Sequence, residues 1–388
     1  MEKKIRHDSK YIQVFEPTVT TKDKISVVRA LNKKYISGTS PIIKKFEENL
    51  EAKFGVKKAV AVTNGSVALD LAFQLLGLED GDEVILPSFT IISCLSAVIR
   101  SKAKPVFCDV DSNSWNMTLQ NVKDVFTKNT KAVLMVHTYG LTAEAVEIKK
   151  FCETNKIFLI EDAAEAHGQN VDGQLCGTFG NISTLSFYAN KHLTTGEGGA
   201  LLINDEQYYE EALKMRNLDF DNSRRFQHEN FYWNYRMSGL QAALGLSQIS
   251  SIEKTIEKKI KQASIYNNIF SQCNKIQIPL VENMGTKNHY WVYGIVLNTK
   301  SRNELSYYLN KEGIQTRNFF WPLHLQNALN EKFKSQFNLK VSEKLGRDGL
   351  YIPLGDHLSE KKQLQIGEKI IKFVDNQKIF SFINSLEY

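Results

Sequence analysis

One lysine lies in a stretch of low charge whose neighbours favour a chemical role. Lys191 follows the segment SFYAN (residues 186–190) and precedes the glycine-rich turn GEGG (residues 196–199). Lysine is usually a solvated surface residue, and we assign most of the 49 lysines and arginines in the chain to solvated helix surfaces. A partly desolvated lysine has a lowered pKa, and its neutral amine is a nucleophile toward an aldehyde. The setting of Lys191 therefore indicates a reactive amine.

A carboxylate follows an apolar run at a position where α/β proteins bind ligands. Residues 157–161 are predicted to form a strand, and the motif EDAAEAHG (residues 161–168) begins at its end. In open α/β sheets, ligands lie at the carboxyl ends of the strands, where this strand would deliver Asp162. Two interpretations of Asp162 remain open at this point: it pairs with a protonated ring nitrogen, or it caps a helix.

Two further segments carry polar groups next to predicted helices. The run TNGS (residues 63–66) lies between a predicted strand and a predicted helix. Gly65 would let the backbone approach a ligand, the free N–H groups of the helix would form an anion site, and Ser66 would add a hydroxyl. Ser66 as a simple N-cap is the alternative. Residues 233–243 lead from aromatic side chains into an apolar helix, and composition alone assigns them to core packing with a solvated Arg236.

Strand-like and helix-like segments alternate around these motifs. The predicted strands are residues 58–62, 83–86, 105–109, 132–136, 157–161 and 200–203, and the predicted helices are residues 23–32, 40–54, 66–76, 91–100 and 144–155. This alternation predicts an α/β fold with crossover units and a mainly parallel sheet that is covered on both faces.

The pattern changes near residue 250. A long charged helix is predicted over residues 251–273, followed by a strand at 291–297, a helix at 302–312, a strand at 314–317 and a helix at 360–375. A chain of 388 residues exceeds the size at which one core usually stops growing. We therefore predict a large domain over residues 1–250 and a smaller C-terminal α/β domain over residues 251–388.

Composition and charge exclude several classes of protein. The chain is 42% hydrophobic and 24% charged, which is typical of a soluble globular enzyme and not of a disordered or fibrous chain. The net charge of +6 comes from scattered lysines, so it would at most steer an anionic substrate weakly. Nucleic-acid binding needs a clustered basic face, which the sequence does not show, and we predict no nucleic-acid partner.

Cysteine and histidine spacing argue against metal sites and disulfides. The five cysteines include no CxxC pair, and the eight histidines include no HxxxH or HExxH pair. We therefore predict no metal, no disulfide framework and a reducing cytoplasmic environment. The polar start MEKKIRHDSK does not resemble a signal peptide, and the longest apolar stretches are too short to span a bilayer, so we expect no membrane association.

With these residues in hand, the chain resembles the nucleotide-sugar aminotransferases of the DegT/DnrJ/EryC1/StrS family and, within it, the branch of the GDP-perosamine synthases. The most specific motifs are EDAAEAHG (161–168), NKHLTTGEGGA (190–200) and NYRMSGLQAALGL (234–246). Their order, and the spacing between Asp162 and Lys191, agree with the family pattern. The resemblance covers nearly the whole chain and implies an aspartate-aminotransferase-like pyridoxal phosphate (PLP) fold of type I.

The resemblance also implies roles at the cofactor. Lys191 matches the lysine that carries PLP as a Schiff base and moves the proton during transamination. Asp162 matches the aspartate that keeps the pyridinium nitrogen protonated. Glu165 occupies the position near the phenolic oxygen. Where the family commonly stacks an aromatic on the cofactor ring, this chain has Ile91, so either Ile91 or the nearby Phe89 packs on the ring.

A phosphate site and a second subunit follow from the same resemblance. Gly65, Ser66 and Ser186 match positions that bind the cofactor phosphate. Asn234 matches an asparagine that reaches the phosphate from the neighbouring subunit. The resemblance therefore implies a homodimer with a composite active site.

The family also separates two chemistries and points to the acceptor region. A dehydratase branch has histidine at the position of Lys191, so the lysine favours amine transfer. Arg236, Arg317 and His324 are candidate contacts for the acceptor's phosphates or sugar, each with a structural alternative. Asn318, where perosamine synthases usually have proline, and residues 216–220, which lack the glycine often found there, weaken the assignment of a specific acceptor.

The implied activity is transfer of an amino group from L-glutamate to a keto sugar. The leading acceptor is a nucleotide-linked 4-keto-6-deoxy sugar used for surface polysaccharide, as O-antigen or capsule. A small phosphorylated ketone such as dihydroxyacetone phosphate, aminated for capsule modification, is the alternative. A catalytically silent PLP-binding regulator is an alternative of another class.

Overall fold

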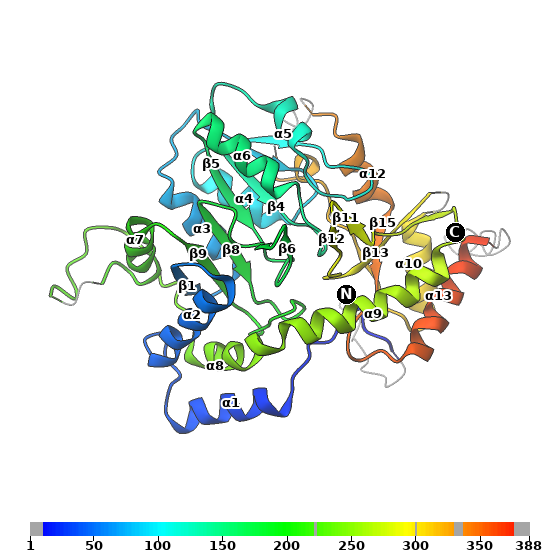
Figure 1. Cartoon of the computed structure of the whole chain (residues 1–388), viewed down its shortest axis with the longest axis horizontal. Coiled ribbons are helices and arrows are strands. Elements are labelled where there is room, and N and C mark those ends of the chain that lie inside the picture. Colours follow the sequence, from blue (N-terminus) through cyan, green and yellow to red (C-terminus); the bar gives the residue numbers. More distant parts are fainter. Residues whose placement is uncertain (1–10, 221–222, 299–300, 330–336, 376–388) are drawn as a thin grey trace.

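The computed structural model describes residues 11–220, 223–298, 301–329 and 337–375. Its centre is a seven-stranded sheet (Figure 1). In sheet order the strands are β1 (Lys58–Val62), β9 (Gly199–Ile203), β8 (Ile182–Ser186), β5 (Phe158–Asp162), β4 (Thr130–Val136), β2 (Glu83–Pro87) and β3 (Lys104–Cys108). The strands from β8 to β3 pair in parallel, whereas β9 runs antiparallel to both β1 and β8. The mainly parallel α/β sheet predicted from the alternation is confirmed.

Helices cover both faces of this sheet because its strands are apolar on both sides. In β1, Ala59 and Ala61 belong to the core on one face, whereas Val60 and Val62 belong to the core on the other. The first core includes side chains of α2 (Pro41–Phe54), α5 (Leu119–Val125), α6 (Ala145–Asn155) and α8 (Gly239–Gln248). The second core includes side chains of α3 (Gly65–Leu75), α4 (Ile92–Arg100) and α7 (Glu206–Arg216).

A smaller antiparallel sheet follows in the C-terminal part of the chain. Its strands, in sheet order, are β10 (Ile276–Gln277), β13 (Tyr293–Leu297), β15 (Gly349–Ile352) and β14 (Arg317–Asn318). It packs with the helices α9 (Ile252–Phe270), α10 (Arg302–Lys311), α12 (Lys340–Asp348) and α13 (Glu360–Asp375). The remaining elements are α1 (Thr21–Asn32), the ribbons β6 (Asn170–Val171) with β7 (Gln174–Leu175) and β11 (Glu282–Asn283) with β12 (Thr286–Lys287), and short 3-10 turns at Ile249–Ser251 and Leu323–Leu325.

The long helix α9 joins the two parts, as Figure 1 shows. Its first residues, Ile252 and Ile256, belong to a core of the large sheet, whereas Ala263, Tyr266 and Phe270 belong to the core of the small sheet. We propose residues 1–250 and 251–388 as the two domains on this basis. The N-terminal segment also reaches the small domain, because Ile12 lies beside Ile314 in a β-bridge.

Most predicted elements lie within two residues of their observed bounds, and the exceptions have local causes. The predicted strand at 314–317 is wrong: Ile314 donates its N–H to Leu309 at the end of α10, and the strand β14 begins only at Arg317. The predicted strand at 291–297 begins at Tyr293, after Tyr290 with a φ of 50°. Within the described ranges, the structure contains no helix that is long and apolar enough to cross a membrane.

Gly140 permits close contact between the domains because it has no side chain. Its φ is +97°, and a Cβ there would lie 2.6 Å from the backbone nitrogens of Tyr290 and Trp291. Its carbonyl oxygen accepts hydrogen bonds from the His289 N–H (3.0 Å) and the Gln169 amide (2.8 Å). The loop after β4 and the segment before β13 are therefore in direct backbone contact.

Gly140→Ala is expected to lower the free energy of unfolding by about 3 kcal/mol, because the left-handed backbone strain adds to a backbone clash. Gly77→Ala is the matched control, since Gly77 also has a positive φ (+61°) but a Cβ there would meet nothing within 4 Å. That control is expected to cost only about 1 kcal/mol. Denaturant unfolding measures both values, and equal costs would contradict the proposed contact.

Candidate active site

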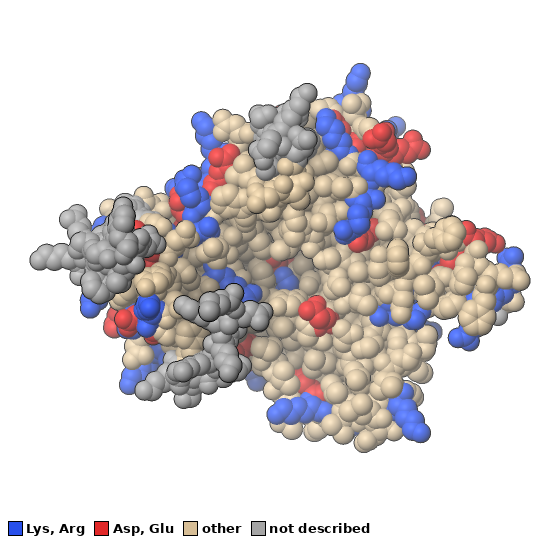
Figure 2. All heavy atoms as spheres, turned by 180° about the vertical axis from the view of Figure 1, so that it is seen from behind, with Lys and Arg blue, Asp and Glu red and all other residues tan. Residues whose placement is uncertain are grey.

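A pocket of about 510 Å³ opens at the carboxyl ends of the parallel strands, between the two domains. Several residues singled out from the sequence line it: Gly65, Ser66, Ile91, Asp162, Glu165, Ser186, Lys191 and Arg317. Phe89, Asn234, Arg236 and His324 do not line it. In Figure 2, most of the face shown is uncharged, and positively and negatively charged side chains lie near one another mainly around its edge.

Lys191 lines this pocket, and its side chain is only 9% exposed. Its Nζ is 3.6 Å from Oε1 of Glu165 and 3.8 Å from the centroid of the Trp291 ring. Burial lowers the pKa of Lys191, and the charges of Glu165 and Asp162 counteract this effect. The site therefore holds an amine that reaches its neutral, nucleophilic form more readily than a surface lysine does.

The two carboxylates beside Lys191 come from the end of β5 and the turn after it. Burial raises the pKa of Glu165 to about 7, although the charge of Lys191 works in the opposite direction. Asp162 accepts hydrogen bonds from the Ala164 N–H (3.0 Å) and the Cys94 thiol (3.5 Å), and burial raises its pKa as well. Asp162 is thus a buried carboxylate whose charged form a cationic ring nitrogen would stabilise.

Small polar residues surround the N-terminus of α3 on the pocket wall. Asn64 caps this helix by accepting a hydrogen bond from the Val67 N–H, so Ser66 is not the N-cap. The Ser66 hydroxyl instead pairs with that of Ser93 at 2.7 Å. A Cβ on Gly65 would lie 2.8 Å from the Cβ of Ser186, so only glycine permits this close approach. Free backbone N–H groups and these hydroxyls together suit a phosphate.

The donor set of the pocket fits PLP. The N-terminus of α3, with Ser66, Ser93 and Ser186, would hold the phosphate, and Asp162 would hold the protonated ring nitrogen. The amine of Lys191 would hold the aldehyde carbon. Of the two candidates for packing on the ring, only Ile91 lines the pocket. The ring of Phe89 is fully buried and meets those of Tyr139 and Phe320 edge-on.

The three acceptor contacts suggested by the sequence have different surroundings. Arg317 lines the pocket mouth, pairs with Tyr351 across β14 and β15, and lies over the ring of Phe15 at 4.8 Å. Arg236 donates to Oδ1 of Asn217 at 2.5 Å instead of facing the pocket.

His324 is also engaged inside the protein. It is fully buried, with Nδ1 2.7 Å from the Ser88 hydroxyl and Nε2 3.3 Å from Glu343. These bonds fix the segment after Pro322 against the end of β2. An acceptor in the pocket would therefore meet Arg317 and not His324.

Sequence reasoning missed the aromatic wall of the pocket. Tyr188, Trp291, Phe320 and Tyr351 line it, and Trp291 contacts Lys191 directly. Trp291 belongs to the run HYWVY (residues 289–293), which gave only a strand prediction. Three of the four side chains come from the small domain, so their position depends on how the domains pack.

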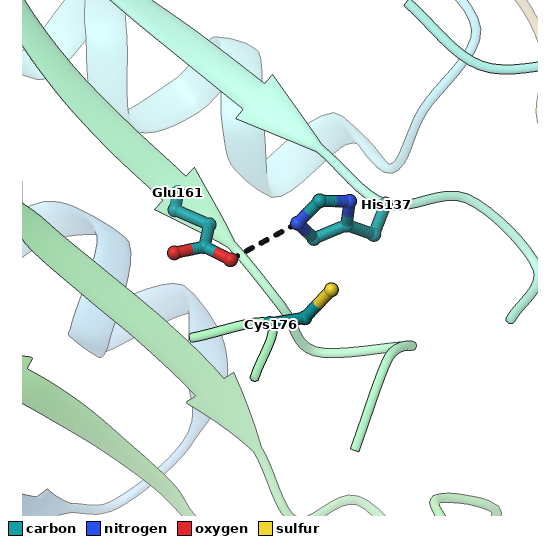
Figure 3. Close-up of side chains that lie close together, drawn as sticks. All are labelled: His137, Glu161 and Cys176. Carbon is teal, nitrogen blue, oxygen red and sulfur yellow. Dashed lines mark hydrogen bonds and ion pairs between the residues drawn. The ribbon is translucent and has the colours of Figure 1, made fainter. Parts of the chain in front are cut away.

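A fully buried cluster of His137, Glu161 and Cys176 lies near the ends of β4 and β5 (Figure 3). The three ligand-type atoms lie within 4.8 Å of one another, which is close enough to hold a metal ion. The carboxylate of Glu161, however, already accepts hydrogen bonds from His137 Nε2 (3.0 Å) and from the backbone and side-chain donors Gly177, Phe179, Gly180 and Ser183. His137 Nδ1 accepts from the Ala143 N–H at 3.1 Å, which leaves the ring proton on Nε2.

Hydrogen bonds thus account for all the polar atoms of His137 and Glu161. A cation would have to displace the proton on Nε2 and several N–H donors. The cluster instead ties the end of β5 to β4 and to the turn before β8. We infer that it holds the backbone of Asp162 in place, since the His137 N–H also donates to the Asp162 carbonyl at 3.2 Å.

Comparison with known proteins agrees with this geometry. The model of the DegT/DnrJ/EryC1/StrS aminotransferase family matches residues 18–371. The chain is 34% identical to GDP-perosamine synthase of Escherichia coli O157:H7, over 95% of this chain and 100% of that protein. It is also 34% identical to GDP-perosamine synthase of Vibrio cholerae, over 81% and 86% of the two chains. The crystal structure of the aminotransferase TlmJ from Streptoalloteichus hindustanus aligns with a TM-score of 0.87 at 28% identity, covering 92% of this chain and 97% of that one.

Glu161→Gln is expected to lower the free energy of unfolding at neutral pH by about 3 kcal/mol, because the amide would face N–H donors without an accepting charge. Burial acts to raise the pKa of Glu161, but the His137 and backbone hydrogen bonds lower it below its ordinary 4.5. The stabilisation is therefore present above pH 4.5 and is lost as the pH falls through the folded-state pKa.

Denaturant unfolding across the acidic range tests this expectation. The difference between the wild type and Glu161→Gln should shrink as the pH falls. Glu153→Gln, an exposed site on α6, is the matched control and should change stability by less than about 0.5 kcal/mol. A Glu161 variant as stable as the control would contradict the proposed network.

Proposed function

Because the chain belongs to the DegT/DnrJ/EryC1/StrS aminotransferase family, we propose that it transfers an amino group from L-glutamate to a nucleotide-linked 4-keto-6-deoxy sugar. The chain is a PLP-dependent aminotransferase. The observation that carries the proposal is the buried amine of Lys191, held between Glu165 and Trp291 in a pocket that also presents Asp162. The names of the relatives support the class of acceptor, since two of them make GDP-perosamine.

In the proposed mechanism, each residue acts through a stated atom. The Nζ of Lys191 removes a proton from the reacting carbon of the donor and returns it during transfer to the acceptor. The carboxylate of Asp162 holds the ring nitrogen in its protonated form. When bound, PLP supplies the electron sink and carries the amino group between the two substrates. Glu165 Oε2 accepts a hydrogen bond from the Tyr139 N–H at 2.9 Å, and this bond keeps the carboxylate beside the Lys191 amine.

The acceptor would enter past residues that suit an anion and a sugar. Arg317 at the pocket mouth offers a guanidinium, and the rings of Tyr188, Phe320 and Tyr351 offer flat surfaces on which a sugar or base packs. We propose that the aminated sugar is used for surface polysaccharide, as O-antigen or capsule. The relatives also include the spore coat polysaccharide biosynthesis protein SpsC of Bacillus subtilis, 31% identical over 76% of this chain.

We further propose a homodimer in which Asn234 reaches the cofactor phosphate of the partner subunit. Asn234 is exposed, and its segment presents Phe231 and Trp233, which are 104% and 67% exposed. Large exposed apolar side chains of this kind are typical of an interface. We place the reaction in the cytoplasm, because all five cysteines are free, as is usual in a reducing compartment.

Lys191→Ala is expected to bind PLP but to lose at least about 1,000-fold in turnover, because both the attaching amine and the base are removed. Dialysis-resistant cofactor absorbance measures binding, and glutamate-dependent amination measures turnover. Lys261→Ala, an exposed site on α9, is the matched control and should keep full activity. Near-normal turnover of the Lys191 variant would overturn the assignment of the base.

The acceptor is tested by loading the wild type with pyridoxamine phosphate and offering a panel of ketones. A nucleotide-linked 4-keto-6-deoxy sugar is expected to regenerate the absorbance of PLP most efficiently. A faster response to dihydroxyacetone phosphate would favour the phosphorylated-ketone alternative. A PLP-loaded protein that responds neither to glutamate nor to any ketone would favour the catalytically silent alternative.

Mixing two inactive variants tests the composite site. In a heterodimer of Lys191→Ala with Asn234→Asp, one site combines the intact Lys191 of one subunit with the intact Asn234 of the other. After random reassembly, about one quarter of the wild-type activity should return, since half of the dimers are mixed and each has one intact site. No recovery, in a mixture shown by differently tagged subunits to contain heterodimers, would contradict the role of Asn234 across the interface.

A further inference from the structure

A second cavity also reaches Lys191. It has a volume of about 50 Å³ and is separate from the active-site pocket. Its walls come from the N-terminal segment, the loop around Lys191, α9 and residues 354–356. Two buried polar atoms among its lining residues, Asn190 Oδ1 and His192 Nε2, have no hydrogen-bond partner in the described part of the chain. Lys191 therefore lines two cavities, the active-site pocket and this second cavity, which is also polar.

Lys259 on α9 lines this second cavity. Its Nζ donates a hydrogen bond to the carbonyl oxygen of Trp291 at 2.8 Å. The nearby carboxylate of Asp356 forms an ion pair with the preceding lysine, Lys258, at 2.7 Å. Among the described residues, no carboxylate lies within 4 Å of the Lys259 amine. Lys259 thus places an amine without an ion pair close to Lys191, and this amine is charged only below its pKa, which burial lowers to about 7.

Trp291 connects Lys259 to Lys191. Its indole is 3.8 Å from the Lys191 Nζ, measured to the ring centroid, and its Nε1–H donates to the carbonyl oxygen of Asn190 at 3.1 Å. Lys259 holds the backbone of the same residue. The hydrogen bond from Lys259 therefore fixes the indole that packs on the Lys191 amine.

The charges around the Lys191 amine are of both signs. On the pocket side, Asp162 and Glu165 favour the protonated amine, and the buried thiol of Cys94 lies near them. On the other side lies Lys259, whose pKa is lowered to about 7 by burial first and by the charge of Lys191 second. The remaining titratable groups that line the second cavity are Glu16, Asp23, His192 and Asp356, of which Asp23 is bound to Thr20, Ser247 and Gln248.

We propose that Lys259 is a positioning residue for Lys191: it holds Trp291 against the amine and, when protonated, counteracts the charges of the two carboxylates. This inference rests on the proposed function in one respect, namely that Lys191 carries the cofactor. Without a charge at 259, the two carboxylates would stabilise the protonated amine, which cannot attach to the cofactor or accept a proton.

Two variants test the charge while both keep a hydrogen-bond donor for the Trp291 carbonyl. Lys259→Gln removes the charge but keeps a donor for the Trp291 carbonyl, whereas Lys259→Arg keeps the charge. Each is compared with Lys261→Met, which removes an exposed charge from the same helix. All proteins are loaded with PLP, and their visible absorbance is titrated from acidic to alkaline pH, which reports the protonation of the linkage at Lys191.

The midpoint of this titration is expected to rise, by at most about one pH unit, in Lys259→Gln, since the positive charge that Lys259 carries below its pKa of about 7 is lost. It should stay at the wild-type value in Lys261→Met, and it should not rise in Lys259→Arg, which keeps its charge at alkaline pH. Because the neutral fraction of the amine falls with the same shift, the rate constant for association of PLP with the cofactor-free Lys259→Gln protein should drop by up to about tenfold at slightly acidic pH, where Lys259 is protonated.

The outcomes distinguish this inference from the proposed function. A wild type that forms no visible band with PLP would contradict the role of Lys191 itself. A wild type with a clear transition, and a folded Lys259→Gln with the same midpoint and association rate, would overturn the role of Lys259 alone. If Lys259→Gln does not fold, as judged by circular dichroism, Lys259→Met at the same readouts replaces it. An upward shift in Lys259→Arg as large as the one in Lys259→Gln would also overturn the inference.

Discussion

A buried amine held beside two buried carboxylates is the arrangement on which the rest of the structure depends. Asp162 and Glu165 belong to the end of β5 and the turn after it, whereas Lys191 belongs to the loop after β8, and burial disfavours the charged form of each one. Water would screen them if the pocket were open on all sides. The fold therefore has to bring the end of β5 and the loop after β8 together, and it has to cover them with a second domain.

The network around Glu161 explains how the large domain meets the first requirement. Its carboxylate accepts N–H groups from Gly177, Phe179 and Gly180, which form the turn that leads into β8. The strands β5 and β8 also pair in parallel, with Asp162 opposite Thr184. The buried carboxylate of Glu161 thereby orders both the strand that carries Asp162 and the strand that leads to Lys191. The residue that stabilises this part of the fold therefore also positions groups of the site.

The sequence predicted the parts of the site that are set by local pattern. Lys191, Asp162 and Gly65 follow strands or precede helices in short motifs, and the structure places all three around one pocket. Contacts between distant segments left no such pattern. Trp291, which contacts Lys191, lies 100 residues further along the chain. His324 was predicted to contact the substrate, but it is bonded to Ser88, which lies 236 residues away in the sequence. The polar strand β8, with the sequence ISTLS, was missed because it lacks a clear apolar run.

The second requirement, a cover over the amine, is met through the backbone of the small domain. The indole of Trp291 reaches Lys191 only because Gly140 allows the segment before β13 to lie against the loop after β4. A side chain at 140 would push that segment, and the indole with it, away from the amine. Lys259 acts on the same residue from the other side, through its carbonyl oxygen. The protonation of Lys191 is therefore tied to how closely the two domains pack, and any change that separates them also exposes the amine to water and favours its charged form.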